Sequence, residues 1–186
     1  MMATTHRLGG IAAGAAAAAL LHTNTAGTMI LITGALIGSI FPDIDNKKST
    51  ISRKLPITAL VVSAGRHLIN AVTASFPKEQ KQYVKLLIGH RGFTHSIIGS
   101  AILPVIVILI GLLIKLKMRH LLLAGLGLFS GCLSHLFLDM LSGGVPLFMP
   151  FSTDLLIIAR IKTGSSIEGL FRMCLALILL FSLFGK

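Results

Sequence analysis

Histidine and aspartate are the residues of this sequence best suited to chemistry, and one pair of them stands at helical spacing. His135 and Asp139 are four residues apart in the run GCLSHLFLDML. This spacing places an imidazole and a carboxylate on the same face of a helix, where both can bind one cation. Because the rest of the run is apolar, both groups are expected in or near hydrocarbon, where ionisable residues are rare and tend to be functional. The alternative is a hydrogen bond between the two side chains that stabilises the helix end.

Two further segments carry side chains of the same kind. Asp43 and Asp45 lie in FPDIDNKKS, where Pro42 is expected to end the preceding helix. Two carboxylates on a loop can bind a hard or borderline cation from different sides, although Pro, Asp and Asn are also common residues of a plain turn. The segment HRGFTHS contains His90 and His95, which a turn at its glycine would bring to one side.

The segment HRGFTHS also carries groups that suit an anion. Thr94 is positioned to cap the helix that follows. Arg91 and the N-terminus of that helix could together hold a phosphate oxygen. A solvated basic loop is the alternative interpretation of this segment.

Long apolar runs must position these groups. Of the 186 residues, 54% are hydrophobic and 12% are charged, whereas a soluble domain carries about 25% charged residues. Length and composition predict a single all-α domain, residues 1–186, embedded in a membrane as a polytopic helical bundle of about five segments. The five apolar runs are Leu8–Leu21, Thr28–Phe41, Ser96–Leu116, His120–Leu141 and Gly169–Phe184.

Not every run has the length of a full span. A straight helix needs about 20 residues to cross the hydrocarbon, so the third and fourth runs are long enough and the first two are short. The first two need their flanking residues or a thinned bilayer to cross, or they enter part way as a hairpin. Glycines and alanines in Leu8–Leu21 favour a closely packed interior helix, with a cleaved signal peptide as the alternative. Leu55–Phe76 is mixed in character and is predicted to be an amphipathic helix at the interface.

The distribution of basic residues predicts how the runs are oriented. If the five runs cross in turn, 13 of the 17 Lys and Arg residues fall on the face that holds the N-terminus, and 4 fall on the opposite face. The positive-inside rule makes the first face cytoplasmic, in the inner membrane of the cell. The net charge of +11 then reflects basic loops beside anionic lipid. With no Trp and one Tyr to stack on bases, nucleic-acid binding is not expected.

The same face collects the reactive groups. Four separate span ends deliver His or Asp side chains to it, and the loop before the last run adds Glu168, which fits a ligand and a helix-start residue equally well. The candidate metal ligands are His6, Asp43, His90, His95, His135, Asp139 and Glu168. Their gathering predicts a metal site at one surface of the membrane.

The segments that carry these groups resemble the YdjM family of membrane-bound, predicted metal-dependent hydrolases. The matching stretches, in this order over most of the chain, are THRLGGIAAG, GSIFPDIDNKKSTISRKLP, GHRGFTHSIIGSAILP, SHLFLDMLSGGVPLFMPFS and IKTGSSIE. The resemblance implies a hydrolase and, for some bacterial members, an association with the DNA-damage response. The family is distantly similar to the zinc phospholipase C/P1 nuclease superfamily, whose H-x-x-x-D pair matches His135 and Asp139. The second H-x-x-x-E pair of that superfamily is missing here, so one or two metal ions are expected rather than three.

These observations lead to one expected reaction and two rivals. A divalent ion, zinc by its preference for His and carboxylate ligands and manganese as the second choice, would serve hydrolysis of a phosphoester in an anionic, lipid-like substrate. Asp43 and Asp45 are the expected catalytic carboxylates, and Arg91 and Ser96 are expected to bind the substrate. A metal ion or proton transporter could use the same cluster, and a non-catalytic protein could use the basic face to hold membrane lipids or a partner. Nothing in the sequence predicts the oligomeric state.

Overall fold

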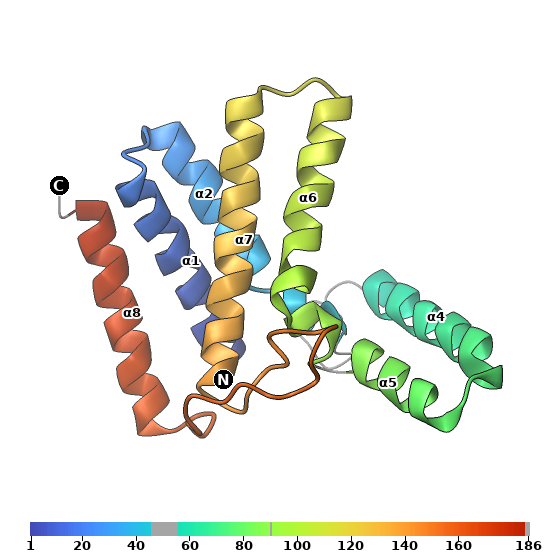
Figure 1. Ribbon diagram of the computed structural model, residues 1–186. Coiled ribbons are helices and arrows are strands. Elements are labelled where there is room, and N and C mark those ends of the chain that lie inside the picture. The colour runs from blue at the N-terminus through green and yellow to red at the C-terminus, as the bar shows by residue number, and fades with distance from the viewer. Residues whose placement is uncertain (46–55, 90, 185–186) are drawn as a thin grey trace.

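Five long helices form an up-and-down bundle in the computed structural model, which describes residues 1–45, 56–89 and 91–184 (Figure 1). The helices are α1 (Ala3–Leu20), α2 (Thr25–Gly38), α6 (Ile97–Leu113), α7 (Met118–Met140) and α8 (Ser166–Phe184). Helix α7 is central, because it contacts α1, α2 and α6, while α8 packs against α1. The starts of α1, α6 and α8 and the ends of α2 and α7 therefore meet at one end of the bundle, called the site end below.

Three of the helical segments in the described ranges are long and apolar enough to span a membrane. They are Thr25–Asp43, which is α2 with the turn after it, Met118–Met140 and Ser166–Phe184. Helix α6 is apolar but shorter. Helix α1 does not qualify, because its second turn begins with His6 and Arg7. The prediction of an all-α membrane bundle is confirmed, whereas the number of five spans is not.

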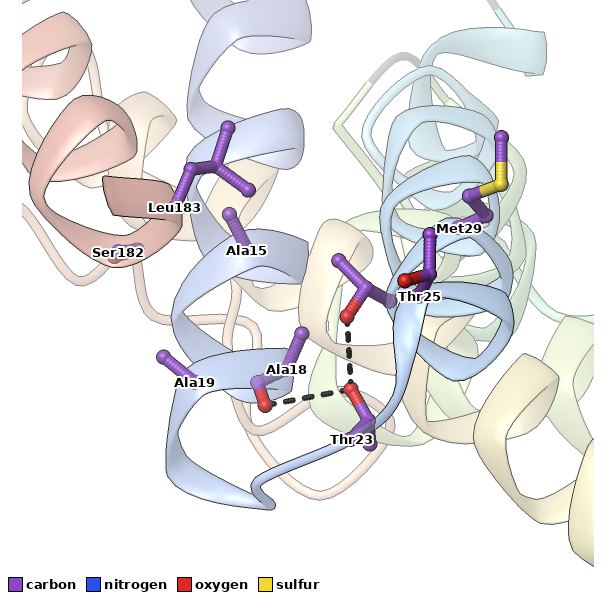
Figure 2. A pocket seen from close by; sticks show the side chains of 9 residues that line it. Ala15, Ala18, Ala19, Thr23, Thr25, Met29, Ser182 and Leu183 are labelled. Atoms are coloured by element: carbon purple, nitrogen blue, oxygen red, sulfur yellow. Dashed lines mark hydrogen bonds between the residues drawn. The ribbon is translucent and has the colours of Figure 1, made fainter. Parts of the chain in front are cut away.

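A tight turn joins α1 to α2 at the end of the bundle away from the site end. Asn24 caps α2, since its side-chain oxygen accepts the backbone N–H of Gly27 at 3.0 Å. The Thr23 hydroxyl donates to the Ala18 carbonyl at 3.4 Å and shares a second hydrogen bond of 3.0 Å with Thr28 (Figure 2). These bonds hold the turn beside a cavity of about 250 Å³ that the end of α8 also lines.

Two helices project sideways from the site end of the bundle (Figure 1). The predicted amphipathic helix Leu55–Phe76 corresponds to α4 (Pro56–Val72) and the short η2 (Thr73–Ser75). A second helix that the sequence analysis missed, α5 (Lys78–Ile88), begins directly after Pro77. Both helices expose large apolar side chains, so a location at the membrane interface stays a prediction for the pair.

Glycines allow α2 and α7 to pack with their backbones in contact. A Cβ atom at Gly131 of α7 would lie 2.0 Å from the Ala35 carbonyl oxygen, and one at Gly38 of α2 would lie 2.0 Å from the Leu128 carbonyl oxygen. Any side chain at these positions would push the two helices apart. Small residues at a close helix crossing are typical of packing within membranes. This crossing sets the end of α2 against the last turns of α7.

Helix α1 packs through small residues, as its sequence predicts. A Cβ atom at Gly10 would lie 2.7 Å from the Ala35 carbonyl oxygen of α2, and one at Gly9 would lie 2.8 Å from the Leu138 side chain of α7. Both glycines are buried in the bundle. Their position fixes the preceding turn of α1, which carries His6, beside the end of α7.

Candidate metal centre

One face of α7 carries both the close helix packing and two candidate ligands. Gly127, Gly131, His135 and Asp139 follow one another at intervals of four residues. Residues spaced in this way lie along one gently winding face of a helix. His135 and Asp139 are both buried. The approach of α2 that the glycines permit therefore also covers the two candidate ligands.

The end of α2 holds the His135 ring in a defined orientation. Nδ1 of His135 lies 2.6 Å from the carbonyl oxygen of Ser39. Because a carbonyl only accepts, Nδ1 carries the proton and donates, which leaves a lone pair on Nε2 of the neutral ring. The buried Nε2 atom has no hydrogen-bond partner in the described part of the chain. A backbone carbonyl that orients a histidine through its second nitrogen is a common support for metal-binding imidazoles.

Two short 3-10 helices bring a third and a fourth candidate ligand. Asp43 lies in η1 (Phe41–Asp45), which begins three residues after the last residue of α2, and its side chain is 30% exposed. His95 ends η3 (Phe93–His95), just before α6, and is fully buried. Its Nδ1 atom forms a hydrogen bond of 3.1 Å with the Thr94 hydroxyl. The Oδ1 atom of Asp43 and the Nε2 atom of His95 both lie close to the candidate ligands at the end of α7.

The side chains of Asp43, His95, His135 and Asp139 lie close together, and each of the two imidazoles is close to both carboxylates. Nε2 of His95 lies 3.8 Å from Oδ1 of Asp43 and 3.6 Å from Oδ2 of Asp139. Nε2 of His135 lies 3.8 Å and 3.7 Å from the same two oxygens. A tetrahedral zinc site with bonds of 2.0–2.2 Å has ligand-to-ligand distances of about 3.3–3.6 Å. A contraction of a few tenths of an ångström would bring each of these imidazole–carboxylate pairs to the spacing of two ligands of one cation.

His6 adds a second group that overlaps the first. Its Nε2 atom lies 3.5 Å from Oδ1 of Asp139, and its ring stacks on that of His135 with a centroid distance of 4.0 Å. His6, His135 and Asp139 form one group that could hold a metal ion, and Asp43, His95 and His135 form the other. Asp139 turns one carboxylate oxygen toward each side. We call these five residues, His6, Asp43, His95, His135 and Asp139, the His/Asp cluster.

Arg91 lies at the edge of the His/Asp cluster. Its Nη2 atom donates to Oδ1 of Asp139 at 3.1 Å, and Nη1 donates to the Gly144 carbonyl at 3.4 Å. The backbone of Arg91 is left-handed, with φ of 59°, a conformation that non-glycine residues hold only when their surroundings enforce it. The side chain is 30% exposed. Arg91 therefore brings a positive charge from the cluster to the surface.

The structure does not bring Glu168 into the cluster. The fully buried Glu168 carboxylate accepts hydrogen bonds of 2.6 Å from the Met2 N–H, the Thr5 hydroxyl and the Gly164 N–H. Three donors use its oxygens, so the predicted ligand acts as a clasp between the start of α1 and the start of α8. The clasp holds the turn of α1 that carries His6.

Three other residues were predicted to take part in the site, namely Ser96, Asp45 and His90. The Ser96 hydroxyl caps α6, since it accepts the Gly99 N–H at 3.0 Å and donates to the Phe93 carbonyl at 2.8 Å. Ser96 rather than Thr94 is thus the cap, and contact of Ser96 with a substrate stays a prediction. Asp45 ends η1, but its side chain lies outside the described residues, as does His90.

Sequence reasoning missed two parts of this site. The Ser39 carbonyl leaves no trace in the sequence, because every residue has one. The glycines of the α2–α7 crossing did leave a trace, since Gly34 and Gly38 repeat the four-residue spacing of Gly127 and Gly131. Two such pairs on neighbouring apolar runs indicate a close helix crossing. Reading that signal would have placed the end of α2 next to His135.

The donor set of the cluster fits a divalent metal. Imidazole nitrogens and carboxylate oxygens are the ligands that zinc accepts in tetrahedral sites, and manganese accepts them with more oxygens. The Nε2 lone pair of His135 faces two carboxylates that also only accept hydrogen bonds. Positive charge between these atoms would stabilise an arrangement that is otherwise repulsive. The His/Asp cluster is therefore a candidate metal centre.

Comparison with known proteins agrees with the segments noted in the sequence. A family model described as YdjM inner membrane protein matches residues 1–185. The chain is also similar to the uncharacterized protein YvsG of Bacillus subtilis (strain 168), with 29% identity over 171 residues, which are 91% of this chain and 86% of the relative. No solved structure matches the chain. The match and the apolar helices together indicate an inner membrane location.

Proposed function

We propose, starting from the fact that this chain belongs to the YdjM inner membrane protein family, that it is a metal-dependent hydrolase. Its substrate would be a lipid or lipid-like phosphoester at the cytoplasmic face of the membrane. The observation that carries the proposal is the gathering of His95, His135, Asp43 and Asp139, with four nitrogen-to-oxygen distances of 3.6–3.8 Å, in two overlapping groups that could hold a metal ion. Zinc is the metal that these imidazole and carboxylate ligands favour.

The residues of the cluster would have different roles in hydrolysis. A divalent cation bound there would activate a water and stabilise charge on a phosphoryl oxygen. A carboxylate of the Asp43–Asp45 turn would accept the proton of the water that attacks phosphorus. The same carboxylate would return that proton to the alcohol oxygen as its bond to phosphorus breaks. Asp43 suits the role because it is the most exposed of the cluster carboxylates.

The surroundings of the cluster support an anionic substrate. Arg91 reaches from Asp139 to the surface, where its guanidinium could pair with a phosphate in a bidentate manner. Of the Lys and Arg residues that the structure describes, most lie in segments at the site end of the bundle. By the positive-inside rule, this excess supports a cytoplasmic orientation of the site. An anionic lipid head group at that surface would meet the metal centre and Arg91 together.

A transporter is the rival function, and the described part of α7 does not favour it. Ion transport requires polar or ionisable groups along a path through the bundle. Between His135 and the start of α7, the buried residues in the described structure are apolar or small, namely Leu121, Gly125, Gly127, Leu128, Gly131 and Cys132. The ionisable groups of the cluster stay at one end. A liposome uptake assay with zinc would separate the two functions, because a hydrolase moves no ion.

The direct test is the metal content of the protein purified in detergent. We expect about one equivalent of divalent metal or more in the wild type, and its loss in Asp139→Asn and His135→Ala. Asp154→Asn and His67→Ala are matched controls, because both side chains are exposed and lie outside the cluster. Hydrolysis of a panel of phospholipids should follow metal content across the five proteins. A wild type that is fully stable and free of metal would refute the proposal.

A further inference from the structure

Basic side chains gather at the turn between α6 and α7, at the end of the bundle away from the site end (Figure 1). We call this end the distal end. Three cations and one histidine fall within six residues there, and all four side chains are exposed: Lys115, Lys117, Arg119 and His120. The six Asp and Glu residues of the chain belong to segments at the site end, so none of them neutralises these cations. An anion from outside the chain would have the complementary charge.

The dipole of α7 adds to the positive charge of the distal end. Lys117 occupies the N-cap position of α7, and its side chain accepts no N–H group there. Arg119 and His120 belong to the first turn, which contains no acidic residue. The N-terminus of a helix carries partial positive charge, so cations there are unfavourable unless an anion lies nearby. A phosphate would interact with these side chains and with the N–H groups of the first turn together.

Lys115 occupies a backbone position at which glycine is usual. Its φ angle is 58°. The N–H of Lys115 donates to the Leu112 carbonyl at 3.0 Å, and the N–H of Leu116 donates to the Gly111 carbonyl at 2.9 Å. This pattern ends a helix with one left-handed residue, and glycine is favoured because it has no Cβ atom to strain. A lysine there has a conformational cost, which binding of an anion by its ammonium group would offset.

An apolar groove leads from the distal end into the bundle between α2, α6 and α7. It consists of two adjoining cavities of about 440 Å³ and 350 Å³ that share Ile30, Val107 and Ala124. The second cavity is also lined by Leu116 and His120, which alternate in the sequence with the basic residues. We call the two cavities together the α2–α6–α7 groove. Its opening therefore lies beside the basic side chains and not beside the His/Asp cluster.

The groove has the depth of one membrane leaflet. Along α6 its lining extends from Ile114 at the distal end to Leu103, a rise of about 16 Å at 1.5 Å per residue. Half the thickness of the hydrocarbon core is about 15 Å. On α7, Lys117 precedes Leu121 by four residues and Ala124 by seven, so it extends the face that lines the groove to the membrane surface.

We propose that the distal end binds an anionic phospholipid of the leaflet opposite the His/Asp cluster. Its phosphate lies beside Lys115 and Lys117, and one acyl chain lies in the α2–α6–α7 groove. The charge of the head group selects the lipid, whereas the chain contributes close packing, because it leaves one hydrocarbon medium for another. The binding does not rest on the proposed hydrolase function, since this phosphate is at the opposite end of the bundle from the metal centre.

The absence of tryptophan from the chain allows a fluorescence test. Ile110→Trp places one reporter in the groove lining, where Ile110 is 53% exposed. Leu109→Trp is the matched control, because Leu109 is 55% exposed and lines neither cavity. Each protein is reconstituted in phosphatidylcholine vesicles with a rising fraction of phosphatidylglycerol that has brominated acyl chains, which quench tryptophan on contact. A parallel series uses phosphatidylethanolamine with the same chains.

The two series give the relative binding constant of the two lipids at each reporter. At Ile110→Trp we expect a preference for phosphatidylglycerol of about fivefold or more, the effect of one lysine beside anionic lipid. At Leu109→Trp we expect none. Replacing Lys115 and Lys117 together by Gln should remove the preference at Ile110→Trp. Replacing Lys78 and Lys85 by Gln, both exposed on α5 at the site end, is the matched control and should keep it.

Four results would overturn this proposal. One is the absence of a preference for phosphatidylglycerol at Ile110→Trp. A second is an equal preference at Leu109→Trp, which would show general attraction of anionic lipid to the basic turn. A third is a preference that survives the loss of Lys115 and Lys117. The last is a reporter at Ile110→Trp that neither lipid quenches in a protein that crosslinks as a dimer, which would assign the groove to a second copy of the chain.

Discussion

Replacing Gly131 by alanine should damage the metal centre from a distance. The added Cβ atom would lie 2.0 Å from the Ala35 carbonyl oxygen, whereas an ordinary contact begins at 3.4 Å. The difference, 3.4 − 2.0 = 1.4 Å, is the separation that α2 and α7 must gain at this point. The clash is with backbone, so no side-chain rotation relieves it. Overpacking of this kind costs about 1–3 kcal/mol of folding free energy.

The separation of α2 and α7 affects the metal centre because Ser39, next to α2, is hydrogen-bonded to His135 of α7. Ser39 follows α2 directly, and its hydrogen bond to His135 measures 2.6 Å. If the full shift is transmitted, the bond lengthens to about 4.0 Å, which is too long for a hydrogen bond. Loss of such a supporting bond lowers metal affinity by about 10- to 100-fold. The expected result is therefore a protein that still folds but binds zinc more weakly, by about 1.4–2.8 kcal/mol.

The assay is zinc titration by competition with a chelating dye, together with thermal unfolding in detergent. Gly169→Ala is the matched control, because a Cβ atom there would have no neighbour within 4 Å. We expect wild-type zinc affinity and an unchanged or slightly raised Tm for Gly169→Ala. Wild-type affinity and Tm for Gly131→Ala would show that the glycine crossing does not position His135.

Three further predictions concern the surroundings of the cluster. Glu168→Gln should lower stability by about 1.5–3 kcal/mol in thermal unfolding, because the neutral amide replaces a carboxylate that accepts from three donors; an unchanged Tm would contradict the clasp. Arg91→Ala should retain its metal by elemental analysis but lose most hydrolysis of bis(4-nitrophenyl) phosphate, and full activity would exclude Arg91 from phosphate binding. Removing metal with a chelator should lower the Tm of the wild type, because the ion binds the folded state, and should leave the Tm of Asp139→Asn unchanged.

The sequence predicts the parts of this site that depend on spacing along one helix or on the order of the apolar runs. The spacing of four residues from His135 to Asp139 is enough to place both on one face of α7. The alternation of runs is enough to bring His6, Asp43 and His95 to the same end of the bundle. Each of these inferences uses only helix periodicity and the thickness of a membrane.

Contacts between distant segments could not be predicted in the same way. Glu168 has the chemistry of a ligand, and its role as a clasp depends on Thr5, which is 163 residues away. The Ser39 carbonyl belongs to the backbone, so no residue type marks it. Helix α5 was missed because its first five residues are all charged or amide side chains, and its apolar residues are confined to the second half of the helix. These features depend on tertiary packing, which local sequence patterns do not report.

The spacing of glycines and ligands on α7 restricts how the length of this helix can change. Gly131 faces α2 and Asp139 faces the cluster, so the glycines that pack against α2 and the candidate ligands lie along the same side of α7. Deleting one residue between Gly131 and His135 would turn the rest of the helix by about 100° relative to the glycines. His135 and Asp139 would then leave the face of α7 that packs against α2. A deletion in the loop between α7 and α8 has no such effect on the phase of α7, so variation in length can be accommodated there.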